Sequence, residues 1–290
     1  MRVKVSIITV NYNGYDDTCA LIESIPLNDK SLEVIVVDNA SRINEAEKIS
    51  AKYPLVKTIR SEQNLGFAGG NNLGIKEASG DYLFFINNDT YLKDFNISAL
   101  IDRLNSSSEI GMVCPKIRFA WGNNPIQFAG YTPLSRITLR NKAIGYNEQD
   151  KGQYNEDHPT PYAHGAAMMA KREAIEKVGV MPECYFLYYE ELDWSMMFRR
   201  VGFQIWYEPA CTVFHKESRS TGVNSPLKAY YITRNRLLFI SRNEKSNIRF
   251  ASYIYIIAVV ALRDIIKYLL KGQFRQINAT IKGIFHFFKI

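Results

Sequence analysis

The chain has 290 residues, of which 47% are hydrophobic, and its mean hydropathy is −0.19. This length and composition exclude an intrinsically disordered protein and predict one large domain with an appendage. The formal net charge of +7 is uneven, because residues 226–290 carry twelve Lys or Arg against two acidic residues, a net of +10, which leaves −3 for the rest. The basic C-terminal part therefore suggests a polyanionic surface as its partner.

The four cysteines are scattered, and no close pair suggests a zinc site or a redox motif. The apolar start of the chain is interrupted by Lys4, Ser6 and Thr9, and no small-residue cleavage site follows, so it does not fit a signal peptide. These features predict a cytoplasmic protein.

Three short apolar runs near the N-terminus each end at polar residues: residues 3–10 before Asn11, residues 32–37 before Asp38, and residues 82–86 before Asn87, Asn88 and Asp89. Each run is followed by a helix-like segment, which is typical of buried parallel strands. Ligands of open α/β sheets bind beyond the carboxyl ends of the strands. The polar tips therefore predict a site for a nucleotide diphosphate with its metal ion, in which Asp89 holds the cation.

The same alternation continues along the chain. Helices are expected over residues 17–25, 44–52, 66–78, 97–105, 171–178 and 191–202, and further strands over 56–59, 111–119, 166–170 and 204–207. The fold class is therefore α/β, a mixed, mostly parallel sheet flanked by helices. Residues 123–161 lack periodicity and are predicted to form a binding loop or lid.

Several polar tips have a second interpretation. Asp38 could accept a hydrogen bond from a ribose hydroxyl or a base N–H, or it could cap the next helix in competition with Ser41. Asp89 could equally stabilise a turn by bonding its own backbone. Gly66 opens a glycine-rich helix start, where close backbone approach and the helix N-terminus favour an anion, although a plain turn is the alternative.

Residues 185–194 bring three carboxylates together with aromatic side chains. If a helix begins near Glu190, then Glu190 and Asp193 share a face and Glu191 points elsewhere. A carboxylate in an aromatic pocket can act as a general base, but acids at a helix N-terminus can also be structural. His215 could complete a metal shell and His164 could contact substrate, although a lone histidine is more often structural.

Taken in order, several segments resemble the motifs of family 2 glycosyltransferases with the GT-A fold, in particular rhamnosyltransferase-like members; they are residues 6–13, 36–41, 64–71, 87–89, 150–154, 165–168 and 190–193. The resemblance covers residues 3–220. It implies that residues 87–89 replace the Asp-X-Asp metal motif of the family, with only the last Asp retained. It also implies that the catalytic base is Glu191, with Glu190 as the alternative, in the position of a Glu-Asp pair.

The resemblance also implies the other roles. Asn11 and Asp38 would hold the nucleoside, and Asp89 and His215 would bind Mg²⁺ or Mn²⁺. The full donor-binding set is Thr9, Asn11, Asp38, Asn39, Asn64, Gly66, Asn71 and Asn88. The acceptor-binding set is His164, Asp193 and Trp194.

The implied reaction is a single inverting displacement that moves a sugar from a nucleotide-diphosphate sugar to a hydroxyl of a saccharide or polyprenyl-linked saccharide, in cell-envelope polysaccharide synthesis. dTDP-rhamnose is the favoured donor, and UDP-hexoses are possible. One alternative is a sugar-phosphate nucleotidyltransferase, but residues 11–17 are not the glycine-rich basic loop that it needs. The other is a non-catalytic, membrane-anchored nucleotide- or carbohydrate-binding module. No nucleic-acid partner is expected.

The predicted domains are a glycosyltransferase domain over residues 1–225 and a helical, aromatic-rich extension over 226–290. The apolar run 251–262 is shorter than the roughly 20 residues that a membrane span needs. Aromatic and basic residues alternate around Leu and Ile, as in helices that lie in a membrane interface. We expect the extension to place the protein on the inner face of the cytoplasmic membrane. Packing on the main domain, or a homodimer through these helices, is the alternative.

Overall fold

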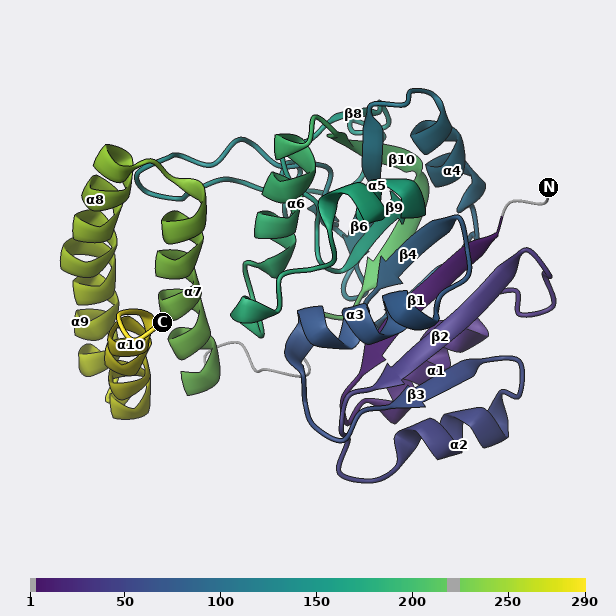
Figure 1. The fold of residues 1–290 in the computed structure, drawn as a ribbon, viewed down its shortest axis with the longest axis horizontal. Helices are drawn as coiled ribbons and strands as arrows, with labels where there is room; N and C mark the ends of the chain where they lie inside the picture. The colour runs from purple at the N-terminus through teal and green to yellow at the C-terminus, as the bar shows by residue number, and fades with distance from the viewer. Residues whose placement is uncertain (1–3, 218–224) are drawn as a thin grey trace.

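The computed structural model describes residues 4–217 and 225–290. Within these residues the main body is built on a ten-stranded sheet in the order β3-β2-β1-β4-β9-β6-β10-β5, with β7 beside β6 and β8 beside β10. Figure 1 shows helices on both faces of this sheet and a group of C-terminal helices at one side of it. The α/β class and the mixed, mostly parallel sheet are as predicted.

The N-terminal half of the sheet is parallel, with strands β1 (Val5–Asn11), β2 (Leu32–Asp38), β3 (Lys57–Arg60) and β4 (Tyr82–Ile86). The helices α1 (Tyr15–Glu23), α2 (Glu45–Lys52) and α3 (Gly66–Glu77) connect them. The Val, Ile and Phe side chains of these strands are buried on both faces, as their continuous apolar runs indicate. Asn11 pairs with Asp38 across β1 and β2, so the polar strand tips meet at one edge.

The other half of the sheet is where the pairing becomes mixed. Strand β9 (Ala167–Lys171) runs antiparallel between β4 and β6 (Ile110–Phe119), and β6 is parallel to β10 (Gln204–His215). The strand expected at residues 204–207 continues to His215 past an irregularity between Glu208 and Thr212. The short β5 (Thr90–Tyr91) pairs with the end of β10, which brings His215 beside Thr90 and the tip of β4.

The remaining elements of the body are α4 (Ser98–Asn105), β7 (Ile126–Phe128), β8 (His158–Pro159), α5 (Arg172–Val178), η1 (Glu183–Tyr185) and α6 (Glu190–Arg200). The stretch 123–161, predicted to be an irregular loop, contains β7 and β8. Between these strands, residues 129–157 form a long excursion that extends toward the C-terminal helices (Figure 1). Arg136 in this excursion forms an ion pair with Glu244 at 3.1 Å, and its carbonyl accepts a hydrogen bond from Ser252.

The C-terminal helices are α7 (Pro226–Asn243), α8 (Ser246–Ile254), the π-helical η2 (Tyr255–Ala261), α9 (Leu262–Leu270) and α10 (Phe274–Phe287). Ser225 caps α7 by accepting from the backbone N–H of Lys228, and Pro226 occupies the first turn. Helix α10 packs along α7, where Gly283 lies against the carbonyl of Tyr230. In the described part of the chain, no helix is long and apolar enough to cross a membrane.

A second hydrophobic cluster connects these helices to the body. It contains Tyr185 from η1, Leu237 and Ile240 from α7, Ile256 from η2 and Leu139 from the excursion. Tyr253 and Phe287, two aromatic residues of the extension predicted to contact a membrane, pack against this cluster. Helix α7 is therefore part of the packed interior. It joins the outer helices, which are α8, η2, α9 and α10, to the body.

Candidate functional site

A cavity of about 440 Å³ opens at the carboxyl ends of β1 and β4, where the sequence places the polar tips. Its walls come from the N-terminal half, from the loop before α6 and from the first turn of α7. Its lining includes Asn39, Asn64, Gly66, Phe67, Asn88, Asp89, Gln127, His164, Phe186, Leu187, Tyr188, His215 and Lys228. The volume falls in the range of small-molecule sites.

Asp89 and His215, predicted as metal ligands, come together at this cavity. Asp89 Oδ1 lies 3.1 Å from His215 Nε2, and both side chains are mostly buried. His215 Nδ1 lies 2.9 Å from Gln127 Oε1, so Nδ1 carries the hydrogen that Gln127 accepts. The lone pair of a neutral imidazole at Nε2 then faces a carboxylate oxygen. That contact is favourable only if a proton or a cation lies between the two atoms.

This geometry fits a divalent cation. Two neighbouring ligands of an octahedral Mg²⁺, each about 2.0–2.1 Å from the ion, lie about 3 Å apart. Among the described residues, no group of three or more His, Cys, Asp or Glu side chains could hold a metal by itself. Asp89 and His215 are therefore a partial ligand set, of the kind that substrate phosphates complete.

The glycine-rich turn at the start of α3 also lines the cavity, and a network of amides holds it. Asn39 donates to Asn64 Oδ1 at 3.1 Å and to the carbonyl of Gly66 at 3.0 Å, and its own Oδ1 accepts from the backbone N–H of Leu65. Asn64, Gly66 and Asn39 all line the cavity. Gly66 has φ +72°, and a Cβ there would lie 2.1 Å from the carbonyl oxygen of Phe186, so this position requires glycine.

Asn88 is the fourth predicted donor-binding residue that reaches the cavity. Its side-chain amide donates to Thr18 Oγ1 at 3.1 Å, and it lies against Gly14. These contacts fix Asn88 to the start of α1, beside Asp89.

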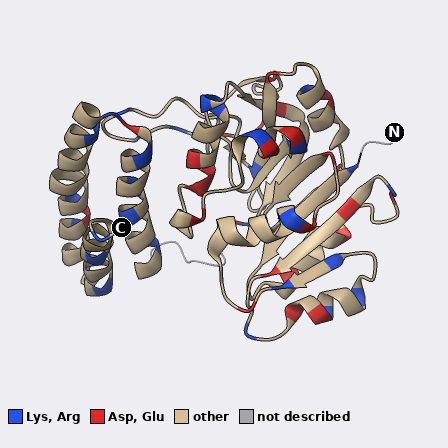
Figure 2. Ribbon diagram, viewed as in Figure 1, with Lys and Arg blue, Asp and Glu red and all other residues tan. Residues whose placement is uncertain are grey.

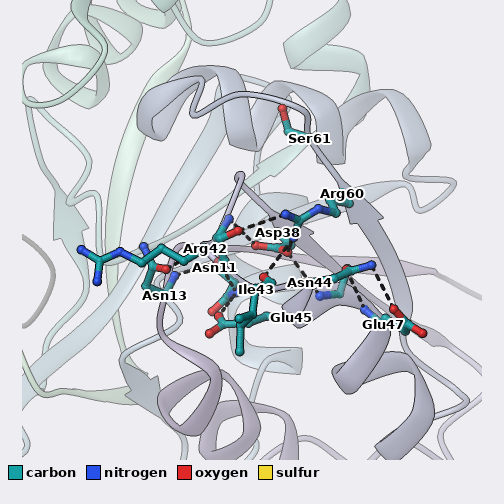
Figure 3. Close-up of polar contacts among 12 residues, drawn as sticks. Asn11, Asn13, Asp38, Arg42, Ile43, Asn44, Glu45, Glu47, Arg60 and Ser61 are labelled. Carbon is teal, nitrogen blue, oxygen red and sulfur yellow. Dashed lines mark hydrogen bonds and ion pairs between the residues drawn. The ribbon is translucent and has the colours of Figure 1, made fainter.

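The predicted nucleoside contacts, Asn11 and Asp38, are instead fully buried beneath the cavity. The Asp38 carboxylate accepts from the backbone N–H groups of Ser41 and Ala46 and pairs with Arg60, as Figure 3 shows. Asn11 donates to Glu45 Oε2 at 2.7 Å. Neither side chain lines the cavity in this arrangement.

The structure also decides between the alternatives for the start of α2. Its N-cap is Asn44, which accepts from the backbone N–H of Glu47. The predicted cap Asp38 also accepts from the backbone N–H of Ala46 in the first turn, whereas the Ser41 hydroxyl accepts from Asn11 and Asn13 instead. Asn71 is buried within α3 and donates to the carbonyl of Phe67. Thr9 is buried in β1, and its hydroxyl has no hydrogen-bond partner among the described residues. Neither Asn71 nor Thr9 lines the cavity.

The two candidate bases begin α6, next to the cavity. A Cβ on Gly165 would lie 3.7 Å from Glu191 Cγ and 3.9 Å from the ring of Phe67, which lines the cavity, so Glu191 packs next to the cavity wall although it is not itself a lining residue. Ser195 fixes this end of α6, because its hydroxyl donates to the carbonyl of Glu191 and accepts from the backbone N–H of Ala163. Glu190 is buried, and its Oε2 has no partner within the described residues.

Burial raises the pKa values of the two carboxyl groups by different amounts. Burial, together with the charge of Glu191, raises the pKa of Glu190 to about 8. Burial also raises the pKa of Glu191, to about 6. The two groups titrate as a coupled pair, so near neutral pH the pair holds one proton, and the larger rise in pKa favours Glu190 as its carrier. This is the division between a proton-bearing group and a base that acid–base sites use.

The three predicted acceptor residues separate into two groups. His164 lines the cavity and packs against the rings of Phe128 and Tyr131, which also contact each other; burial lowers its pKa to about 3, so it is neutral. Asp193 and Trp194 are fully buried away from the cavity. Asp193 accepts from Arg242 and Asn243 of α7. Trp194 donates to the carbonyl of Gly179, and it packs edge-on against Phe85 and Phe198. Neither Asp193 nor Trp194 lines the cavity, and their contact with the acceptor stays a prediction.

The cavity also contains residues that sequence reasoning missed. Gln127 comes from β7, inside the stretch predicted to be a binding loop, but no pattern identified it individually. Phe186, Leu187 and Tyr188 were noted only as aromatic or apolar neighbours of the carboxylates. Lys228 comes from α7, which was expected to lie outside the catalytic region.

Comparisons with known proteins agree with this geometry. The family model "Glycosyl transferase family 2" matches residues 6–179. The low-salt glycan biosynthesis hexosyltransferase Agl10 of Haloferax volcanii is 26% identical over 287 residues, which cover 97% of this chain and 90% of the relative. The N-acetylglucosaminyl-diphospho-decaprenol L-rhamnosyltransferase of Mycobacterium tuberculosis is 24% identical over 237 residues, 74% of this chain and 77% of the relative.

The fold is likewise similar to a solved structure. The crystal structure of GalNAc-T7 with UDP, GalNAc and Mn²⁺ superposes with a TM-score of 0.63 at 17% sequence identity. The match covers 89% of this chain but only 48% of that chain, so it compares the fold of about half of the larger protein. It agrees with the predicted GT-A fold. The family model covers more than half of the sequence, and the chain belongs to glycosyl transferase family 2.

Proposed function

We propose that this glycosyltransferase moves a sugar, with inversion at the anomeric carbon, from a nucleoside-diphosphate sugar to a hydroxyl of a saccharide or polyprenyl-linked saccharide. The single observation that supports this most is the placement of Asp89 and His215 at one side of the cavity and of ionised Glu191 at its edge. A cation-binding pair and a base are the two functions that such a displacement needs.

The roles of the donor side follow from its chemistry. Asp89 and His215 would hold Mg²⁺ or Mn²⁺, and Gln127 would fix the ring of His215 so that Nε2 faces the ion. When bound, the cation supplies Lewis-acid stabilisation of charge on the leaving diphosphate. Asn39, Asn64 and Gly66 present a rigid turn at the helix start of α3, where a phosphate group is favoured.

The acceptor side contains the base. Glu191 would take the proton from the attacking hydroxyl, and protonated Glu190 behind it would remain neutral. His164, neutral and packed against the rings of Phe128 and Tyr131, would donate to or accept from an acceptor hydroxyl. The transition state would resemble an oxocarbenium ion, as in glycoside chemistry generally.

The identity of the substrates is proposed from the relatives. The Mycobacterium tuberculosis relative is named for transfer of L-rhamnose to a decaprenol-linked diphosphate sugar. This supports dTDP-rhamnose as the favoured donor, with UDP-hexoses possible, and a polyprenyl-linked acceptor in the synthesis of cell-envelope polysaccharide. The Mn²⁺ in the GalNAc-T7 structure supports a divalent cation at the donor site.

We further propose peripheral attachment to the inner face of the cytoplasmic membrane through the C-terminal helices. Their exposed side chains include Phe250, Leu262, Leu270, Phe274, Phe285 and Phe288. Figure 2 shows Lys and Arg distributed along the same helices. Exposed aromatic and basic residues together suit an anionic membrane surface. A homodimer through these apolar surfaces is the competing explanation.

A donor panel tests the reaction. The protein is incubated with Mn²⁺ and a polyprenyl-linked saccharide acceptor, in separate reactions with dTDP-rhamnose and with several UDP-hexoses. A parallel reaction contains a sugar phosphate and nucleoside triphosphates, and the released products are identified. Release of a nucleoside diphosphate supports a glycosyltransferase, and release of pyrophosphate from a sugar phosphate and a nucleoside triphosphate supports a nucleotidyltransferase. If no donor is consumed but a donor binds, the proposal fails in favour of a binding module.

A further inference from the structure

The segment that leads into Glu190 has an unusual backbone. Phe186, Tyr188 and Tyr189 have φ of 67°, 69° and 78°, in the left-handed region that L-residues rarely adopt. Phe186, Leu187 and Tyr188 line the cavity, and Glu190 and Glu191 follow directly. A sparsely populated backbone persists only where its surroundings determine it, so the contacts that hold this segment bear on the site.

Asn235 of α7 is the centre of those contacts. Its side-chain amide donates to the carbonyl oxygens of Tyr185, Leu187 and Tyr188 at 2.9, 2.7 and 2.9 Å. Asn235 is fully buried, and replacing its amide would remove one donor from each of these carbonyl groups, although Tyr185 also accepts from Arg234. The three carbonyl groups therefore share the two hydrogens of one amide nitrogen.

The neighbours of Asn235 in α7 complete the arrangement. Arg234 donates to Asn235 Oδ1 at 2.8 Å and to the carbonyl oxygens of Cys184 and Tyr185 at 3.0 and 2.6 Å. Arg236 donates to the hydroxyl of Tyr189 at 2.8 Å. From the other side, the backbone N–H of Phe67 donates to the carbonyl of Phe186 at 2.8 Å. The segment is therefore held between the glycine-rich turn and α7.

We propose that Asn235 is a positioning residue for sugar transfer. By fixing the backbone of residues 185–188, it keeps the cavity wall in place and holds Glu191 at the cavity edge. The inference rests on the proposed function, because it assigns Asn235 a role in that reaction. It also makes α7 a part of the catalytic unit, although the sequence placed this helix in a separate extension.

The test uses the full chain and the variant Asn235→Asp. Asp keeps the shape of the side chain and the acceptor for Arg234, but it replaces the donating amide with an oxygen that faces three carbonyl groups. We expect amide hydrogen exchange over residues 185–189 to rise about tenfold or more, since each unpaired buried carbonyl is costly. With the donor that the panel identifies, kcat should fall by about the same factor, because the base is misplaced.

The matched control is Arg200→Ala. Arg200 links α6 to α7 through the carbonyl of Arg242 and Asn243 Oδ1, far along α6 from the strained segment. If Asn235 acts only by attaching α7 to the body, both variants should behave alike. Positioning requires that only Asn235→Asp changes exchange at residues 185–189 and kcat.

Two further outcomes are decisive. A folded Asn235→Asp protein whose segment exchanges as in the wild type, or exchanges faster with unchanged kcat, overturns the proposal. If this variant does not fold, the half-buried Arg234→Gln replaces it, and the same increase in exchange is expected at Cys184 and Tyr185. Hydrogen exchange needs no substrate, so a failure of the proposed function appears separately, as a wild-type protein that consumes no donor.

Discussion

Glu190 and Glu191 stand next to each other at the first turn of α6, and the charge of Glu191 is one reason that Glu190 keeps its proton. Their backbones are consecutive, but their surroundings differ. Glu190 is buried with one unpartnered oxygen, whereas Glu191 is half-buried beside Gly165 and the cavity. The two residues that the sequence left as competing bases therefore have different protonation states near neutral pH.

The first prediction concerns the variants Glu191→Gln and Glu190→Gln. Glu191→Gln should lower kcat by roughly 10²–10⁴-fold with donor affinity nearly unchanged, because an amide keeps the shape but cannot accept a proton. Glu190→Gln should retain most activity at pH 7, because the amide is a neutral isostere of the protonated acid. Steady-state kinetics and donor titrations measure both effects. The reverse ranking would assign the base role to Glu190.

The pH dependence of the rate is the second prediction. A general base works only when ionised, so kcat/KM should rise with pH and level off above the pKa of Glu191, at about 6. Rate profiles from pH 4.5 to 9 measure this limb. A profile in which activity instead declines as the pH rises through 6 contradicts the assignment of Glu191.

The second prediction extends to stability, because the burial of Glu190 makes the stability of the fold depend on pH. The folded protein binds the Glu190 proton more tightly than the unfolded chain, since the pKa rises from its ordinary value of 4.5 to about 8. This contribution to stability is complete below the unfolded pKa and is lost as the pH rises toward 8. The melting temperature of the wild type should thus fall more steeply over this interval than that of Glu190→Gln. Parallel curves would show that Glu190 is not buried as described.

A third prediction separates backbone strain from contact at the glycine-rich turn. Gly66→Ala introduces a Cβ 2.1 Å from the carbonyl oxygen of Phe186, at φ +72°. Gly272→Ala is the matched control, with φ +65° and no atom within 4 Å of the new Cβ. Both variants lose about 1 kcal/mol or more to the left-handed backbone, but only Gly66→Ala must also move the segment before α6. We expect only that variant to weaken donor binding, as measured by calorimetry.

The cation site gives the fourth prediction. Asp89→Ala should abolish the metal-dependent gain in donor affinity, since Asp89 is the only carboxylate in its motif. Gln127→Leu should reduce metal affinity by about 10–100-fold, the usual effect of removing the partner that orients a histidine ligand. Gln149→Leu, at an exposed position on the body, is the control and should bind as the wild type. Donor titrations with and without Mn²⁺ measure this gain in donor affinity. A full metal-dependent gain in Asp89→Ala would refute the cation site.

The parts of this site that could be predicted from the sequence are those set by local pattern. Apolar runs identify the strands, and parallel strands must end at one edge, so the position of Asp89 followed directly. His215 was identifiable because it ends an apolar run. Its approach to Asp89 depends on the pairing of β5 with β10, which are more than a hundred residues apart.

The other contacts depend on partners that no local pattern indicates. Asp38 is occupied by Arg60, which comes from the neighbouring strand β3. Gln127 reaches His215 from β7, inside the stretch 123–161, whose sequence shows no hydrophobic periodicity. Asn235 lies in a helix whose aromatic and basic composition suggested a membrane role, and its burial against residues 185–188 is visible only in the folded chain. Each of these is a tertiary contact between distant segments.

The last prediction concerns the surface of the outer helices. Helix α9 has no buried residue, and Leu269, Leu270, Phe274, Phe285, Phe288 and Ile290 are all more than half exposed. Each basic residue near an anionic leaflet contributes about 1 kcal/mol, and insertion of apolar side chains adds to it. We therefore expect full-length protein to sediment with anionic vesicles, and less so at high salt, because charges are screened over about 8–10 Å.

Two double variants divide these contributions. Lys282→Glu with Lys289→Glu should weaken binding to anionic vesicles and reduce its salt dependence, whereas Phe285→Ser with Phe288→Ser should weaken binding to anionic and neutral vesicles alike. Lys30→Glu with Lys76→Glu makes the same charge change at exposed positions on the sheet body, in the connection before β2 and in α3, and should leave binding nearly unchanged. Equal loss from this control would mean that net charge alone drives attachment. Negligible binding of the wild type, together with a concentration-dependent dimer that Phe285→Ser with Phe288→Ser dissociates, would reject the membrane and assign these apolar side chains to an interface between two copies of the chain.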